Sequence, residues 1–520
     1  MKSVMTHRFS EVPNVEIPRS TFDRSHGYKT TFDAGYLIPI FVDEALPGDT
    51  FQVRLTGFGR LSTPTYPVMD NMILDTFFFE VPNRLLWSNW RKFCGEQTDP
   101  GDSIAYTIPV MDDDGNAQNF SNESLWDYFG LPTKVTDYYE FSAMPFRAYN
   151  LIWNEWFRDQ NLQDSVAYNI DDGPDDQADY ALLKRGKRHD YFTSALPFLQ
   201  KGDAVELSLG VSAPIDITGD PVFDSASGAG TDYFSSAAGS RTIQGENVAV
   251  RQLSGRIEWS DPGLETNLSS ATASTVNELR QAVQVQRLLE RDARAGTRYA
   301  EIVKSHFGVT FPDLAYRPIY LGGGSTPINI SPIARTDSSP GALGAVGTFA
   351  FRNHGFAKSF NEHSTIIGLA CVRADLTYQE GLEKMWSRQT RYDFYWPTLA
   401  HLGEQSILNK EIYIDATMIG AGTDDDVFGY QERYAEYRYK PSKITGKFRS
   451  NDAASLDAWH LGIEFGALPT LDDTFIQENP PIDRVIVTPT EPHFIYDSYI
   501  NFKCTRPMPM YSIPGLIDHF

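Results

Sequence analysis

Four cations lie within five residues at Lys184, Arg185, Lys187 and Arg188, shortly after an acidic run at residues 171–179. Clustered Lys and Arg side chains can bind the phosphate backbone of a nucleic acid, which requires positive charge but carries no base code. The same cations could instead balance the acidic run within a solvated loop. We therefore take the segment as a candidate DNA contact, with the solvated loop as the plainer alternative.

A second set of cations lies in the C-terminal third, interleaved with aromatic residues. Its cations are Arg438 and four candidate DNA contacts, Lys440, Lys443, Lys447 and Arg449, and its aromatic residues are Tyr437, Tyr439 and Phe448. Cations beside aromatic rings can hold single-stranded DNA by charge and base stacking. Packing between protein subunits explains the same composition equally well, so both interpretations stay open.

The sequence lacks the spacings that catalysis or metal binding would need. Gly322–Gly324 has neither the Lys of a phosphate-binding loop nor the spacing of a dinucleotide motif, and predicts a turn or a close backbone approach. His354 and His363 are too far apart for a helical metal motif. The acidic runs Asp112–Gly115 and Asp424–Asp426 do not follow the pattern of a calcium loop, although a weak cation at a subunit contact stays open. We expect no enzyme activity and no cofactor.

Composition and charge limit the class of protein. The chain has 520 residues and a formal net charge of −23, so any contact with DNA must come from a confined basic patch. Aromatic residues make up 13% of the chain, and this residue type is enriched at protein–protein contacts. The chain shows no secretory signal and no stretch near 18 apolar residues, so we expect no membrane insertion. Three separated cysteines suggest a reducing compartment.

Period-two patterns and buried apolar runs predict strands in both halves of the chain. The predicted strands are Phe51–Leu55, Ile73–Val81, Ser364–Val372, Ile412–Asp415, Arg484–Thr488 and Phe494–Phe502. Helices are predicted from apolar spacing, capping residues and Pro or Gly at their ends. The predicted helices are Arg84–Phe93, Pro145–Arg158, Thr275–Gly296 and Arg298–Phe307.

Two further segments stand apart. Residues 1–35 are expected to form an extended N-terminal arm that is ordered only against a neighbour, and residues 203–272, rich in Ser, Gly, Ala and Thr, to form a surface insertion. The remainder, residues 36–202 and 273–520, would form the core. Strands separated by helices and long loops favour a mainly β fold, a jelly-roll β-sandwich with long insertions and several helices.

Three long motifs resemble signatures of the major capsid proteins of the Microviridae, specifically of the gokushovirus type. They are Lys187–Pro197 (KRHDYFTSALP), Leu289–Tyr299 (LERDARAGTRY) and the C-terminal Pro507–Phe520 (PMPMYSIPGLIDHF). The amino end is also similar, at Ser10–Phe22 and Phe32–Gly35. The resemblance therefore extends along nearly the whole chain.

The resemblance implies a viral jelly roll that assembles with copies of itself into a small icosahedral shell around circular single-stranded DNA. It also implies that an insertion, here best matched by residues 203–272, forms a surface protrusion used in host attachment. Expected partners are the packaged DNA, a small basic DNA-packaging protein, a DNA pilot protein and a host cell-surface receptor. The net acidity predicts that a basic packaging protein, metal ions or polyamines must help to neutralise the DNA. The amount of DNA retained by shells of this chain alone measures that need.

A different class of protein shares the acidity, the aromatic content and the many loops. A β-sandwich carbohydrate-binding or glycan-degrading protein is therefore the alternative. Closed particles seen by electron microscopy would favour the shell protein, and a persistent monomer with sugar affinity would favour the alternative.

Overall fold

The computed structural model of the 520-residue chain is mainly β. It describes residues 17–103, 105–112, 120–135, 139–205, 215–217, 222–225, 231–233, 257–261, 264–266, 276–310, 316–334, 343–414 and 423–511. The chain divides into two compact units, residues 1–199 with 297–520 and residues 200–296. Each unit is described by itself below.

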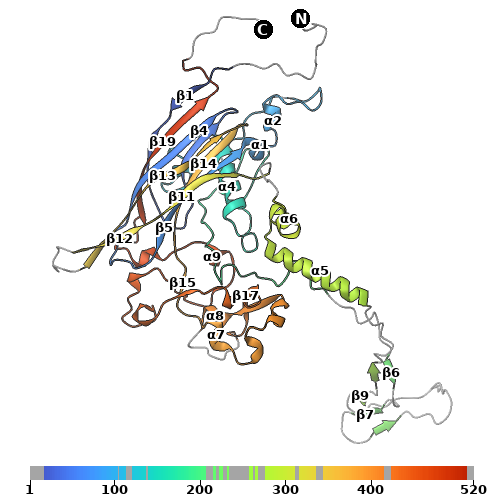
Figure 1. The fold of residues 1–520 in the computed structure, drawn as a ribbon. Coiled ribbons are helices and arrows are strands. Elements are labelled where there is room, and N and C mark those ends of the chain that lie inside the picture. The colour runs from blue at the N-terminus through green and yellow to red at the C-terminus, as the bar shows by residue number, and fades with distance from the viewer. Residues whose placement is uncertain are drawn as a thin grey trace. The chain divides into compact units, whose positions relative to one another are not determined.

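The larger unit contains two antiparallel sheets (Figure 1). The six-stranded sheet has the order β1-β19-β4-β13-β12, and β2 pairs with the other half of β19. Its strands are β1 (Ser20–Asp23), β2 (His26–Phe32), β4 (Thr50–Leu61), β12 (Asn329–Ala334), β13 (Leu343–Ser359) and β19 (Phe494–Arg506). The four-stranded sheet consists of β11 (Ile319–Pro327), β5 (Met72–Pro82), β14 (Ser364–Ala374) and β3 (Ile38–Ala45), in that order.

Aromatic side chains pack the two sheets against each other. Residues of β4 and β19 alternate between buried and exposed along most of each strand, as period-two side-chain geometry requires. The ring of Phe502 on β19 lies 4.9 Å from that of Phe51 on β4 and 5.6 Å from that of Phe41 on β3, centroid to centroid. Phe41 also meets Phe78 of β5 edge-on. This cluster joins both sheets into one core.

The four-stranded sheet is covered on its second face as well. Every residue of β14 is buried, and Leu369 and Cys371 belong to a second core beneath α4 (Met144–Ile152). A π-helical turn, Trp153–Phe157, continues α4. The other helices near this core are short: α1 (Asn83–Leu86), α2 (Trp90–Phe93) and α3 (Leu125–Tyr128).

A third hydrophobic cluster, formed around Tyr191, Phe192 and Ile407, supports the second basic stretch. Its surroundings are built from short elements. These are β15 (Thr377–Tyr378), α7 (Lys384–Ser387), β16 (Glu404–Leu408), α8 (Asn409–Ile412), β17 (Val427–Glu432), β18 (Ser442–Lys443) and α9 (Asp473–Ile476). Single 3₁₀ turns connect them at Arg391–Asp393, Pro397–His401, Ala435–Tyr437, Gly446–Phe448 and Asp457–Trp459, and another occurs at Gln177–Asp179.

The smaller unit, residues 200–296, contains short strands and one long helix, α5 (Val276–Ala295). Its strands are β6 (Ile215–Ile217), β7 (Val222–Ser225), β8 (Thr231–Tyr233), β9 (Ile257–Asp261) and β10 (Leu264–Thr266). The predicted insertion at 203–272 falls inside this unit, which also includes the helix. α6 (Tyr299–Phe307) belongs to the larger unit and ends at Gly308, whose φ is 69°.

Most predicted elements are present, and two strand predictions are wrong. Ile412 ends the helix α8, and Asp415 lies outside the described residues. Residues 484–488 form the end of a 3₁₀ turn (Ile482–Arg484) and a single bridge at Ile486. The predicted helix Arg84–Phe93 is two separate short helices, α1 and α2.

The expectation that residues 1–35 are ordered only against a neighbour does not hold for the part that is described. β1 and β2 both pair with β19 of the same chain. Residues 1–16 lie outside the described residues. Among the helices in the part of the chain that is described, none is both long and apolar enough to cross a membrane.

Candidate nucleic-acid interface

The first basic stretch lies against the four-stranded sheet, and Arg185 has an acidic partner there. Its guanidinium lies 2.5 Å from the carboxylate of Asp75 on β5, which also accepts a 2.8 Å hydrogen bond from Arg373. Burial would raise the pKa of Asp75, but hydrogen bonds from Ser325, Arg185 and Arg373 hold it below its ordinary value. Arg185 therefore serves an internal ion pair.

Lys184 and Lys187 donate to neutral acceptors. The Lys184 ammonium lies 2.8 Å from the amide oxygen of Asn479 and 5.0 Å from the centroid of the Tyr36 ring. The Lys187 ammonium lies 2.6 Å from the backbone oxygen of Phe475. Burial lowers the pKa of both lysines. Arg188 is exposed, and the described residues include no partner for its side chain.

The second basic stretch borders a cavity of about 440 Å³. Lys440, Lys443 and Arg449 line it from one side, and Tyr191 and Phe192 line it from another. The segment that follows the first basic stretch therefore meets the second stretch at this cavity. The candidate cations of both stretches belong to the described part of the chain. Those of the first stretch make no hydrogen bond or ion pair with residues 437–449.

Carboxylates balance much of the positive charge in the cavity wall. Glu383 pairs with Lys443 at 2.6 Å and with Lys440 at 3.5 Å, and these contacts lower the pKa of its carboxyl. Arg449 donates to the backbone oxygen of Gln379. Lys447 is exposed and, within the described residues, its side chain has no partner.

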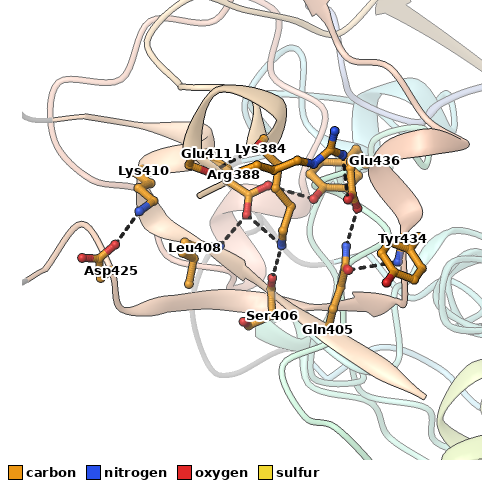
Figure 2. A network of polar contacts seen from close by, with 12 residues as sticks. Lys384, Arg388, Gln405, Ser406, Leu408, Lys410, Glu411, Asp425, Tyr434 and Glu436 are labelled. Carbon is orange, nitrogen blue, oxygen red and sulfur yellow. Dashed lines mark hydrogen bonds and ion pairs between the residues drawn. The ribbon is translucent and has the colours of Figure 1, made fainter. Parts of the chain in front are cut away.

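Two further ion pairs brace the same wall (Figure 2). Arg388 lies 3.1 Å from Glu436, whose other oxygen accepts a 2.6 Å hydrogen bond from Gln405. Lys384 lies 3.3 Å from the buried carboxylate of Glu411. The five cations of the wall therefore share three carboxylates and one backbone oxygen, so each cation has a partner within the chain.

An aromatic surface adjoins the cavity, and only Tyr437 and Tyr439 of its residues were singled out from the sequence. It comprises Trp386, Tyr392, Phe394, Tyr395, Trp396, Tyr437 and Tyr439, all exposed. Arg388 lies 4.4 Å from the centroid of the Tyr437 ring, and Arg391 lies over Tyr392 and Trp396. The run of alternating cations and rings from Lys384 to Trp396 was the signal that could have revealed it.

Other residues noted in the sequence have structural partners. Gly322–Gly324 lies in β11, where a Cβ on Gly323 would overlap the backbone of Thr76, so the glycine run permits a close approach. His354 lies 3.0 Å from the Thr76 hydroxyl and stacks on Phe351. Lys410 pairs with Asp425 in the acidic run 424–426.

Known proteins match the chain along almost its whole length. A family model described as capsid protein (F protein) matches residues 10–516. The chain is 48% identical over 531 residues to capsid protein VP1 of Bdellovibrio phage phiMH2K, covering 99% of this chain and 98% of the relative. It is 45% identical over 591 residues to capsid protein VP1 of Chlamydia phage 1, with coverage of 99% and 98%. It is 34% identical over 547 residues to capsid protein VP1 of Spiroplasma virus 4, with coverage of 98% and 97%.

Proposed function

The chain belongs to the capsid protein (F protein) family of the Microviridae, and from that premise we propose that it closes into a small icosahedral shell around circular single-stranded DNA. As a capsid protein it is a structural component of the virion and not an enzyme. The match over residues 10–516 is the observation that carries the proposal. The two packed antiparallel sheets are consistent with a jelly roll whose strand connections have been extended.

The aromatic surface fits a contact between copies of the chain. Trp, Tyr and Arg are enriched at protein–protein interfaces, and they often supply most of the binding energy. Trp386 is 66% exposed and Tyr392 is 60% exposed in the single chain, so burial against a neighbour would remove much apolar area from water. The cations of the cavity wall beside them already have partners within the chain, which favours this use over phosphate binding.

Of the eight cations predicted to touch DNA, we propose that Arg188 and Lys447 do so. Both side chains are exposed, and neither has a partner among the described residues. Lys184, Arg185, Lys187, Lys440, Lys443 and Arg449 each have a partner within the chain. A phosphate would have to compete with these partners, so the six remain weaker candidates.

The insertion at 203–272 is proposed to contact the host receptor. Deleting residues 205–270 and joining the ends should leave assembly intact, because the larger unit contains both packed sheets and its own cores. Particles of the deletion variant should have lost binding to host cells, measured by a particle adsorption assay.

Electron microscopy of the deletion variant provides the control. Closed particles that still adsorb to host cells at the wild-type level would contradict the attachment role. An unfolded product would contradict the placement of the insertion outside the core. Adsorption by a second variant, with scrambled sequence at 226–256 but unchanged length, separates a loss of recognition from a loss of bulk.

A further inference from the structure

The exposed face of the six-stranded sheet has an unusual charge for this chain. Alternate residues of β4 and β19 point away from the core, as their burial patterns show. Lys29 of β2 lies opposite the exposed Asp497, and Arg352 of β13 lines a hollow with residues of β4 and β19, so both share this face. Five of these exposed side chains are cations. They are Lys29, Arg54, Arg60, Arg352 and Lys503. The strands that carry them lie side by side (Figure 1).

Few carboxylates oppose these cations. On the described strands of this sheet, Asp23 and Asp497 share the face. At its edge, the Glu123 carboxylate accepts a hydrogen bond from the Thr31 hydroxyl. Lys29 lies 3.6 Å from Asp497, and Lys503 is opposite Asp23 in register. Arg54, Arg60 and Arg352 have no ion pair with any described residue. The face is therefore positive on a chain whose net charge is −23.

Two aromatic rings stand among the cations. Phe58 on β4 and Tyr499 on β19 are each 54% exposed. Phe58 lies opposite Asp497, and Tyr499 lies opposite Thr56, so the two rings are diagonal neighbours on one face. A hollow of about 510 Å³ is lined by both rings and by Arg352.

We propose that this face binds single-stranded DNA without sequence preference, with phosphates on Arg54, Arg60 and Arg352 and bases stacked on Phe58 and Tyr499. Grooves that combine backbone-tracking cations with stacking rings hold single strands in this way. The inference rests on the proposed function, in which the shell encloses single-stranded DNA, and names the surface that would hold it.

A second copy of the chain fits this face less well. Lys is depleted at protein interfaces, and this face carries Lys29 and Lys503, although Arg is enriched there. Burying the three arginines without carboxylate partners would cost free energy, so a second copy would have to place a carboxylate against each of them. On the aromatic surface near Trp386, by contrast, the neighbouring cations Lys384 and Arg388 already face carboxylates.

Photocrosslinking of intact particles tests the proposal without altering the protein. Particles are grown with 5-bromodeoxyuridine in their DNA and irradiated, and crosslinked peptides are identified by mass spectrometry. We expect crosslinks at Phe58 or Tyr499. Crosslinks only at other surfaces would overturn the inference. Particles without any single-stranded DNA would overturn the proposed function itself.

A charge variant gives an independent measurement. Arg54→Gln, Arg60→Gln and Arg352→Gln are combined, and binding of oligo(dT) by the full chain is followed against salt concentration. Each phosphate contact on a single strand contributes about 0.7 to the slope of log affinity against log salt, so the slope should fall by about 2. An unchanged slope would contradict the proposal.

A matched variant controls for net charge. Arg91→Gln, Lys134→Gln and Lys304→Gln remove the same number of exposed cations from outside the six-stranded sheet. Its salt slope should remain that of the wild type. An equal fall in both triple variants would show a general charge effect and overturn the assignment to this face.

Discussion

Asp75 is the residue on which the inner end of the first basic stretch depends. It is 4% exposed and lies between the guanidinium groups of Arg185 and Arg373, with a further hydrogen bond from the Ser325 hydroxyl. A buried carboxylate in such a position neutralises charge that would otherwise be left unpaired. Removing one partner of a buried ion pair is strongly destabilising for that reason.

Asp75→Asn should lower the free energy of unfolding by about 3 kcal/mol or more at neutral pH. The folded-state pKa of Asp75 lies below its ordinary value of 3.8, so its contribution is present above that pH and is lost as pH falls through the folded-state pKa. The stability difference between wild type and variant should therefore shrink in strong acid, as measured by denaturant unfolding at several pH values.

Asp425→Asn is the matched control for this charge removal. Asp425 also pairs with a cation, Lys410, but its side chain is 77% exposed. Solvent-exposed ion pairs contribute about 1 kcal/mol or less, so this variant should unfold nearly as the wild type does. A loss for Asp75→Asn no greater than that of Asp425→Asn would contradict the role given to the buried pair.

At this scale the sequence revealed the cations and not their partners. The cluster at 184–188 is visible from composition, whereas Asp75 lies 110 residues away from Arg185 along the chain. No local pattern links two such positions, because the sheet brings them together. For the same reason, the sequence could not show that Arg188 and Lys447 lack the internal partners that the other six cations have.

Glycines in β4 determine how closely β13 can pack. A Cβ on Gly59 would overlap the ring of Phe349, and one on Gly57 would overlap that of Phe351. Both rings point into the core between the sheets, where they lie near Tyr496 of β19. Because Gly57 and Gly59 have no side chain, there is room beside β4 for the aromatic rings of β13.

Gly59→Ala should lower the free energy of unfolding by about 1–3 kcal/mol, because the Phe349 ring must leave its position in a packed core. Gly101→Ala is the control, since a Cβ there meets nothing within 4 Å. Thermal unfolding of the two variants measures the difference. Equal stability of both would show that the core adapts to the extra methyl group.

Elements with a strong period were predictable, and short ones were not. β4, β5, β14 and β19 follow from alternation or from a continuous apolar run. β1 and β2 are short and polar, and their pairing with β19 depends on residues more than 450 positions away. The apolar run at 412–415 predicted a strand. Its first residue, Ile412, instead ends the helix α8, whose start is capped by a hydrogen bond from the backbone of Leu408 to the Glu411 carboxylate.

At the scale of the whole molecule, two exposed surfaces differ in chemistry. The aromatic surface near Trp386 is rich in rings, and the cations of the cavity wall beside it have partners within the chain, which suits burial against another copy. The exposed face of the six-stranded sheet has unpaired arginines and two rings, which suits a nucleic acid. A shell subunit needs both kinds of surface, and the family match makes self-assembly the property on which the other proposals depend.

Electron microscopy of the purified chain at increasing concentration measures that property directly. The account predicts closed particles of uniform size, and a fraction of single chains that falls as the total concentration rises. Chains that remain single at high concentration, particularly if they bind sugars, would contradict it.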